Sequence, residues 1–89
     1  MSEPIDLFRA LSSDQRLKIF RLINGRTLCV NAITARLELT QSAVSQHLKV
    51  LKDAGLVTAT RCGYRTHYTV DQDAVEVYSR AISKLLEAK

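Results

Sequence analysis

Apolar residues recur at helical spacing along the first part of the chain. Residues 4–11 carry apolar side chains on one side and begin with Pro4, which predicts a short amphipathic helix. A second helix is predicted directly after it. Ser12 and Gln15 have the spacing of a capping box at its start, and Asn24-Gly25 marks its end. Its apolar positions are Leu17, Ile19, Phe20, Leu22 and Ile23.

Two further helices are predicted before the middle of the chain. Apolar residues at i, i+3 and i+7 predict a short helix over residues 29–37. After a turn, Thr40 is the expected cap of a longer helix over residues 41–54, and Gly55 is its expected end. The apolar positions of this longer helix are Val44, Leu48 and Leu51.

The pattern changes after Gly55. Residues 56–61 and 65–70 are rich in β-branched and aromatic residues with some alternation, so they predict a hairpin with Gly63 in its tip. Helical spacing then returns, with Asp71 or Asp73 as the capping residue of a last helix. The apolar stripe of this helix is Val75, Tyr78, Ile82, Leu85 and Leu86.

The order of these elements predicts the fold class. A short helix, a tight turn, a longer helix and a two-stranded ribbon form the plan of a winged helix-turn-helix. We therefore expect a mainly α (α+β) fold of about five helices, with the two-stranded wing between helices 4 and 5. A chain of 89 residues has room for one such domain, over residues 1–89.

The composition of the chain indicates the kind of binding partner and the cellular compartment. The net charge of +4 and the pI of about 9.4 favour a polyanionic partner. No apolar run approaches the ~20 residues that cross a bilayer, and residues 1–8 lack the basic and apolar regions of a signal peptide. We therefore expect a cytoplasmic protein with no membrane partner, whose two cysteines are reduced thiols.

The polar face of the helix over residues 41–54 carries the most informative chemistry. Its side chains are mainly short hydroxyls and amides, and no acidic residue occurs before Asp53. Glutamine can bond adenine bidentately, serine can bond a base edge or a phosphate, and the lack of carboxylates avoids repulsion by the duplex. His47, at the edge of the apolar face, either bonds a phosphate or packs against the protein. The predicted DNA-reading stripe is Gln41, Ser42, Ser45, Gln46 and Lys49.

The predicted hairpin tip is basic. Arg61, Arg65 and His67 surround it, and Tyr64 lies on it. Such a loop can follow the phosphates or enter the minor groove, and the alternative is a solvated charged turn. Beside the DNA-reading stripe, we favour phosphate contact.

Thr40 to Val57, "TQSAVSQHLKVLKDAGLV", with the following "RCGYRTHYTV", resembles the ArsR/SmtB family of bacterial winged-helix repressors. "SSDQRLKIFRLI" is similar to that family's second helix. The resemblance implies a homodimer that binds a pseudo-palindromic operator in double-stranded DNA and is released by an inducer, commonly a metal ion or arsenite. It implies that the first and last helices form the dimer interface, which agrees with the apolar surface of the last helix. It also implies that Ser42, Ser45, Gln46 and His47 face DNA.

The chain departs from that family at the metal site. The family's arsenic and cadmium sensors carry Cys-X-Cys in the third helix, whereas Cys29 here is followed by Asn31, whose amide is a poor ligand for a thiophilic ion. The zinc and nickel sensors use acidic and histidine residues of the last helix. This chain offers only carboxylates there: Asp71, Asp73, Glu76 and Glu87. We predict no cofactor and no conventional metal site, but a composite site in a dimer, from both cysteines, His47 and His67, stays open.

A thiol switch is the other sensor hypothesis. Cys29 is predicted near a helix N-terminus, three residues after Arg26, and both features lower a thiol pKa. Cys62 lies on the wing loop, where oxidation or persulfidation would weaken DNA binding. The opposing interpretation is that Cys29 fills a small apolar space and Cys62 is incidental.

Enzyme signatures are missing from the sequence. No glycine-rich phosphate loop, nucleophile elbow or His-carboxylate cluster appears, so we predict that the chain is not an enzyme. The predicted function is sequence-specific DNA binding by a dimeric transcriptional repressor, released by thiol modification or by a small inducer that the sequence does not identify. The alternatives are a metal-responsive repressor with a composite site and, from another class, a winged-helix module that binds a protein.

Overall fold

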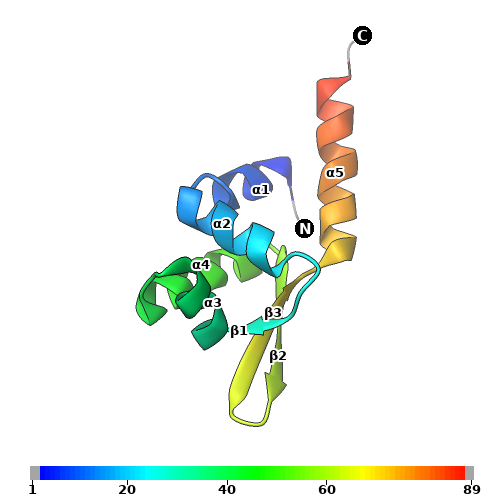
Figure 1. Ribbon diagram of the computed structural model, residues 1–89. Coiled ribbons are helices and arrows are strands. Elements are labelled where there is room, and N and C mark those ends of the chain that lie inside the picture. Colours follow the sequence, from blue (N-terminus) through cyan, green and yellow to red (C-terminus); the bar gives the residue numbers. More distant parts are fainter. Residues whose placement is uncertain (1–2, 88–89) are drawn as a thin grey trace.

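The computed structural model describes residues 3–87 as five helices and three strands (Figure 1). The predicted domain also includes residues 1, 2, 88 and 89, which lie outside the described residues. The predicted helices and hairpin are confirmed. In chain order the elements are α1 (Pro4–Ala10), α2 (Asp14–Ile23), β1 (Leu28–Cys29), α3 (Val30–Leu37), α4 (Gln41–Asp53), β2 (Val57–Cys62), β3 (Arg65–Val70) and α5 (Gln72–Leu86).

The start of α2 differs from its prediction by one residue. Ser13 is the N-cap, and its Oγ accepts a hydrogen bond from the N–H of Arg16 at 3.3 Å. The predicted capping box of Ser12 and Gln15 is therefore wrong. The Ser12 hydroxyl instead donates to the carbonyl of Arg9 at 2.8 Å, where it satisfies the end of α1.

The other predicted helix starts are confirmed. Pro4 occupies the first turn of α1, where its missing N–H leaves no hydrogen bond unmade. Thr40 caps α4. Asp71, rather than Asp73, caps α5: its Oδ1 accepts hydrogen bonds from the N–H groups of Asp73 and Ala74 at 3.1 and 3.2 Å.

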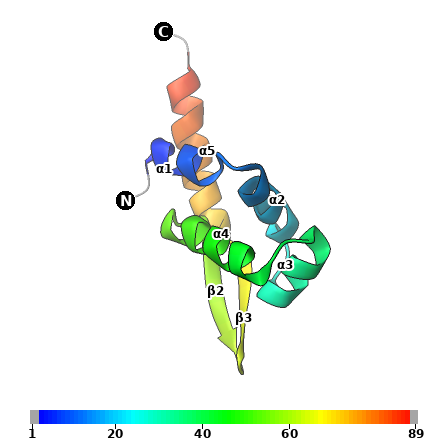
Figure 2. The same cartoon turned by 90° about the vertical axis from the view of Figure 1, so that its left-hand side faces the viewer.

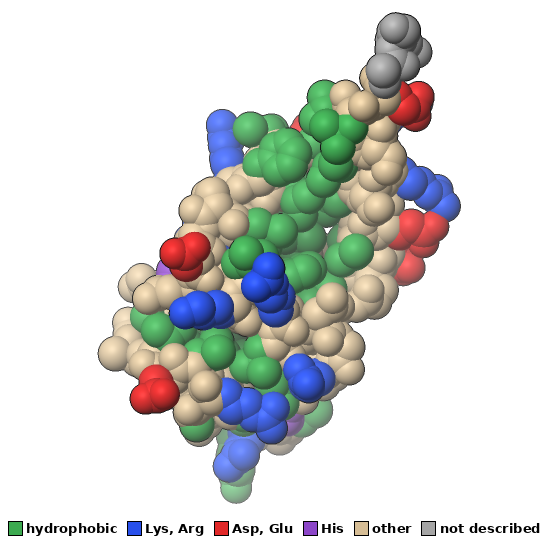
Figure 3. Space-filling model, turned by 45° about the horizontal axis from the view of Figure 1, so that its top comes forward, with side chains coloured by type: hydrophobic (Ala, Val, Ile, Leu, Met, Phe, Trp, Pro, Cys, Tyr) green, Lys and Arg blue, Asp and Glu red, His purple; other side chains and the backbone are tan. Residues whose placement is uncertain are grey.

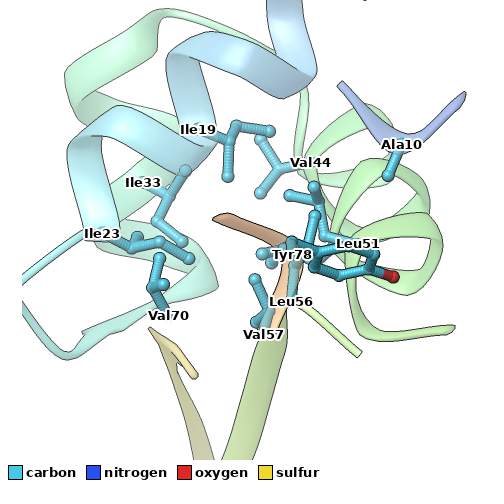
Figure 4. Close-up of a cluster of buried hydrophobic side chains, with 11 residues drawn as sticks. Ala10, Ile19, Ile23, Ile33, Val44, Leu51, Leu56, Val57, Val70 and Tyr78 are labelled. Carbon is cyan, nitrogen blue, oxygen red and sulfur yellow. The ribbon is translucent and has the colours of Figure 1, made fainter. Parts of the chain in front are cut away.

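One cluster of apolar side chains joins the helices to the sheet (Figure 4). Tyr78 of α5 is the largest buried side chain, and its hydroxyl donates to the carbonyl of Ala54 at 2.7 Å, so its polar end is satisfied. Burial of this cluster removes apolar surface from water and supplies the main driving force for folding. Its buried members are Ala10, Ile19, Ile23, Ile33, Val44, Leu48, Leu51, Leu56, Val57, Val70 and Tyr78.

The sheet contains one strand that the sequence did not indicate. Its order is β1-β3-β2, with antiparallel neighbours. β2 and β3 form the predicted wing, with Gly63 at φ +66° in the turn. β1 pairs Leu28 with Tyr68 and Cys29 with His67. The predicted two-stranded sheet was incomplete because a segment of two residues has no period to detect.

The wing and α5 extend from opposite ends of the helical body (Figures 1 and 2). The molecule is therefore elongated, with a longest dimension of 50 Å. α1 lies beside α5, whereas α3 and α4 lie toward the wing. None of the helices within residues 3–87 has the length and apolar character that a membrane span needs.

Candidate nucleic-acid interface

α4 separates its apolar and polar residues onto opposite sides. The three predicted apolar positions are at most 1% exposed and anchor the helix on the core. Thr40 Oγ1 accepts a hydrogen bond from the N–H of Ala43 at 3.1 Å, which fixes the first turn. The helix N-terminus carries a partial positive charge that favours anions. The DNA-reading stripe, all of it exposed, is Gln41, Ser42, Ser45, Gln46 and Lys49.

The amide of Gln41 is held by α3. Gln41 Nε2 donates a hydrogen bond to Asn31 Oδ1 at 3.2 Å, which leaves one N–H and Oε1 for another partner. Asn31 stands at the position of the missing second thiol. No spacing in the sequence signals its link to Gln41, ten residues later, because the link depends on the placement of α3 against α4.

Lys49 ends the stripe in an ion pair. Its Nζ lies 3.0 Å from Asp53 Oδ2, one helical turn further along α4. The two side chains are 75% and 67% exposed, so the pair stabilises the fold by less than about 1 kcal/mol. A phosphate could therefore compete for the lysine at little cost.

His47 lies where α4 meets α2. Its partly buried ring has Nε2 at 2.8 Å from Gln15 Oε1 and Nδ1 at 3.5 Å from Arg16 Nη1. Burial, and then the positive charge of Arg16, lower the pKa of His47 below its ordinary value. The sequence pattern placed His47 at the edge of the apolar face but missed both α2 partners, which lie more than 30 residues earlier in the chain.

The tip of the wing presents basic and aromatic side chains. Tyr64 is 95% exposed, and Arg61 and Arg65 are exposed on the strands beside it. Arg61 Nε donates to the carbonyl of Gly63 at 3.3 Å, so this side chain stays close to the turn. The two arginines and Tyr64 of the predicted basic tip are thus solvent-facing, whereas His67 is half-buried in β3, where it pairs with Cys29 of β1.

A hollow of about 230 Å³ connects the wing to the N-terminal ends of α3 and α4. Its lining includes Gln41 of the stripe, Tyr64 and Arg65 of the wing, and Cys29 and Asn31 from the start of α3. The thiol singled out in the sequence therefore adjoins residues of both predicted DNA-binding elements.

Cys29 is the N-cap residue of α3. Its thiol makes no well-aligned cap hydrogen bond. The N–H of Ala32 is nevertheless the largest cause that lowers the pKa of the Cys29 thiol; burial partly opposes it, and the charge of Arg65 adds to it. The prediction that Arg26 lowers the pKa of this thiol is wrong. Arg26 Nη1 donates to the carbonyl of Leu22 at 2.9 Å, and the positive charge near the thiol comes from Arg65 of the wing instead.

The cysteines do not form a recognisable metal centre. Both are free, and Cys62 is exposed at the end of β2. Within residues 3–87, no three His, Cys, Asp or Glu side chains gather so as to hold a metal ion. Near Cys29 the donors do not fit a thiophilic ion, because the Asn31 amide bonds Gln41 and the nearby charge is the guanidinium of Arg65.

A second surface, here called the apolar face, lies along α1 and α5. A groove of about 290 Å³ runs between these helices and is lined mainly by apolar side chains, Leu7 and Ile82 among them. Figure 3 shows the hydrophobic side chains gathered in a band below the C-terminal end. Exposed members of the apolar face are Ile5 (51%), Phe8 (45%), Leu85 (60%) and Leu86 (75%).

Residues 13–59 match the model of a protein family described as "Bacterial regulatory protein, arsR family". The matched segment runs from the N-cap of α2 through α3 and α4 into β2. It therefore contains the whole DNA-reading stripe and the start of the first strand of the wing.

Curated relatives share most of the chain. The HTH-type transcriptional regulator YbzH of Bacillus subtilis is 38% identical over an alignment 88 positions long, which covers 82% of this chain and 88% of YbzH. The transcriptional activator HlyU of Vibrio cholerae is 31% identical and covers 94% of this chain and 78% of HlyU. The arsenical resistance operon repressor of B. subtilis is 38% identical, with 76% of this chain and 66% of that protein covered.

Solved structures confirm the fold. The solution NMR structure of Mb0332 from Mycobacterium bovis is described as a homodimeric winged helix-turn-helix DNA-binding domain. It matches with a TM-score of 0.76 at 28% identity and covers 93% of this chain and 81% of that one. The predicted winged helix-turn-helix is thus confirmed.

Proposed function

Because this chain belongs to the arsR family of bacterial regulatory proteins, we propose that it is a homodimeric transcriptional repressor that reads an operator with α4. The observation that carries the proposal is the exposed stripe on α4, which has no carboxylate before Asp53. The relatives are transcriptional regulators, so the prediction that the chain is not an enzyme is confirmed.

The stripe suits the edges of bases in the major groove. Gln41 and Gln46 each offer a donor and an acceptor, the pair that adenine requires for a bidentate contact. Ser42 and Ser45 lie on the same side of the first two turns and can bond a base or a phosphate. Lys49 adds a charge further along the helix, once it exchanges Asp53 for a phosphate.

The wing supports contact with the phosphates. Arg61 and Arg65 bring two exposed positive charges to a ribbon that projects beyond the helical body, and Tyr64 lies between them. Arginine recognises phosphate by charge and by paired hydrogen bonds, without regard to the base. We therefore assign orientation and affinity to the wing and sequence discrimination to α4.

The apolar face supports a homodimer. Its exposed leucines and aromatic ring form a patch that a small monomeric domain rarely leaves in water. A second copy can cover it through a two-fold axis, and Mb0332, a solved relative, is homodimeric. Such a dimer would place two copies of α4 in successive major grooves about 34 Å apart.

Repression is the favoured regulatory outcome. A dimer that occupies two half-sites within a promoter blocks access to that promoter. One of the two B. subtilis relatives is the repressor of an arsenical resistance operon. HlyU is named an activator, so the position of the operator would decide the sign of regulation. The repressor assignment therefore applies to an operator that overlaps the promoter.

Release by thiol modification is supported by the surroundings of Cys29. Its lowered pKa increases the fraction of reactive thiolate, and its thiol lies in the same hollow as Arg65 and Gln41. Oxidation or alkylation of Cys29 would change the charge and volume beside these two proposed DNA contacts. A small inducer that fills this hollow would have the same consequence.

Two substitutions test the DNA-binding assignment. Gln46→Ala should lower the ratio of operator to scrambled-duplex affinity by about ten-fold, because it removes a base contact. Arg65→Ala should weaken binding to both duplexes alike and reduce the slope of log affinity against log salt by about one. Arg21→Ala, in which α2 loses the same charge outside the stripe and wing, is the matched control.

The outcomes separate the functional classes. An unchanged affinity ratio in Gln46→Ala would remove Gln46 from the specificity residues. If the wild-type protein binds no duplex even at low salt, the α4 face meets a protein rather than DNA, and the proposed function is wrong.

A further inference from the structure

Arg16 of α2 closes the end of α1. Its Nε donates to the carbonyl of Ala10 at 2.7 Å, and its Nη2 donates to the carbonyl of Arg9 at 3.2 Å. The last carbonyls of a helix have no partner within that helix, so a charged donor placed there stabilises it. α1 is only seven residues long, and the guanidinium ties its C-terminal end to α2.

The third guanidinium nitrogen continues the link to α4. Arg16 Nη1 lies 3.5 Å from His47 Nδ1, and His47 Nε2 lies 2.8 Å from Gln15 Oε1. A guanidinium can only donate, and an amide oxygen can only accept. The two partners therefore define one tautomer of His47, with the proton on Nε2 and a lone pair on Nδ1.

We infer that His47 is a positioning residue, which fixes the recognition helix α4 to α2 and, through Arg16, to the end of α1. Both ring nitrogens already face α2 partners, so neither remains for a phosphate. This inference rests on the proposed function, since α4 must read DNA for its position to matter to the regulator.

A polar link supplies what apolar packing alone does not. Val44 and Leu48, the buried residues that precede and follow His47 in the sequence, hold α4 at its distance from the core, but apolar contacts are not directional. Hydrogen bonds at the edge of that face restrict rotation about the helix axis. A rotation of about 10° moves side-chain atoms ~6 Å from the axis by about 1 Å, enough to misplace a bidentate base contact.

The link also joins the two surfaces of the molecule. α1 carries Ile5 and Phe8 of the apolar face, and its last carbonyls are held by the same guanidinium that contacts His47. A shift of α1 when two protomers associate would therefore reach α4 through the side chains of Arg16 and His47. Dimer contact and base reading are coupled by this path.

Gln15 provides the decisive test because it lies on α2, outside the stripe and wing. We expect Gln15→Ala to lower the operator-to-scrambled affinity ratio by about five-fold, the effect of one lost hydrogen bond, and His47→Ala, which also loses the contact with Arg16, to lower it by at least as much. Because the bond between Gln15 and His47 is already absent in His47→Ala, the double variant should lose no more than His47→Ala alone. The salt slope should stay at the wild-type value in all three.

A direct phosphate contact gives the opposite result. His47→Ala would then weaken both duplexes alike and lower the salt slope, while Gln15→Ala would behave as wild type. That outcome would overturn the inference and return His47 to the DNA contacts.

Two measurements on the free protein keep this test independent of DNA binding. Imidazole 15N shifts should report the Nε2–H tautomer of His47 in the wild type, and the share of the other tautomer should rise when Gln15 and Arg16 are both replaced by alanine. Amide hydrogen exchange in α1 should rise several-fold in Arg16→Ala and His47→Ala but not in Arg21→Ala, which removes the same charge. If the wild-type protein binds no operator, the proposed function is wrong, but the positioning role of His47 is not affected. If hydrogen exchange in α1 is unchanged in Arg16→Ala and His47→Ala and the wild-type His47 ring shows a mixture of tautomers, the positioning role of His47 is wrong.

Discussion

Gln41 is hydrogen-bonded to Asn31, with 3.2 Å between the donating Nε2 and the accepting Oδ1. This bond orients the first side chain of the DNA-reading stripe before any duplex arrives. A preoriented side chain loses less conformational freedom when it binds. Under the proposed function, Asn31 is therefore expected to act on DNA recognition through Gln41.

Removal of this acceptor should reduce base discrimination. For Asn31→Ala we expect the operator-to-scrambled affinity ratio to fall by about three- to five-fold, since the bond lies on the surface. Titration of labelled operator and scrambled duplexes gives this ratio. Asn31→Asp retains the acceptor oxygen and is therefore the matched control. Its operator-to-scrambled affinity ratio should equal that of the wild type once the effect of the added negative charge is corrected for. Equal ratios in wild type and Asn31→Ala would show that Gln41 needs no support.

Cys29 should react with alkylating agents as a thiolate at lower pH in the folded protein than in the unfolded chain. The N–H of Ala32 lowers the pKa of this thiol in the folded state, with a further contribution from Arg65. The pH profile of iodoacetamide reaction, measured in Cys62→Ser so that one thiol remains, should move to higher pH in denaturing urea. Arg65→Ala should move the pH profile of the folded protein part of the way toward the profile of the unfolded chain. Superimposable folded and unfolded profiles would contradict the assignment.

Leu86→Glu should dissociate the proposed dimer without unfolding the domain. Leu86 is 75% exposed within one chain, so its replacement costs little in the monomer but buries a charge in the dimer. We expect the dimer dissociation constant to rise by at least about ten-fold, equal to ~1.4 kcal/mol. Sedimentation at micromolar concentration measures it. Val77→Glu, on the other side of α5 and 56% exposed, should remain dimeric. Loss of the dimer in both variants would place the interface elsewhere.

His47 should make folding stability depend on pH. Burial and Arg16, the charged group that contacts the ring, lower its pKa in the folded state, so the unfolded chain binds this proton first as pH falls. The free energy of unfolding should therefore decrease as pH drops below about 6.5, until the folded ring also titrates. Urea denaturation at pH 7.5 and 5.5, at one fixed protein concentration, measures this difference. His47→Gln should flatten it, and an unchanged pH dependence in this variant would exclude the ring as its source.

Local patterns were sufficient for the helices and the hairpin. Apolar spacing, caps such as Thr40 and Asp71, and the turn at Gly63 act over a few residues, so they can be read from the chain directly. The burial of Val44 and Leu48, opposite a polar stripe, follows from the same period. The candidate DNA surface was therefore predictable as a set of exposed residues.

Contacts between distant segments were not predictable in this way. Two features depend on how the wing packs against α3. One is the pairing of Cys29 in the short strand β1 with His67 in β3, and the other is that Arg65, not Arg26, supplies the positive charge near the Cys29 thiol. The partners of His47 depend on the angle between α2 and α4.

The sequence by itself determined which side chains face solvent on α4 and on the wing, because periodicity and turn chemistry are local. Only the tertiary structure decided which of these side chains are already bonded within the protein. Asn31 with Gln41, and Gln15 and Arg16 with His47, meet across separate helices. Hydrogen bonds of this kind depend on distances of a few ångströms between elements, and packing of the whole core sets those distances.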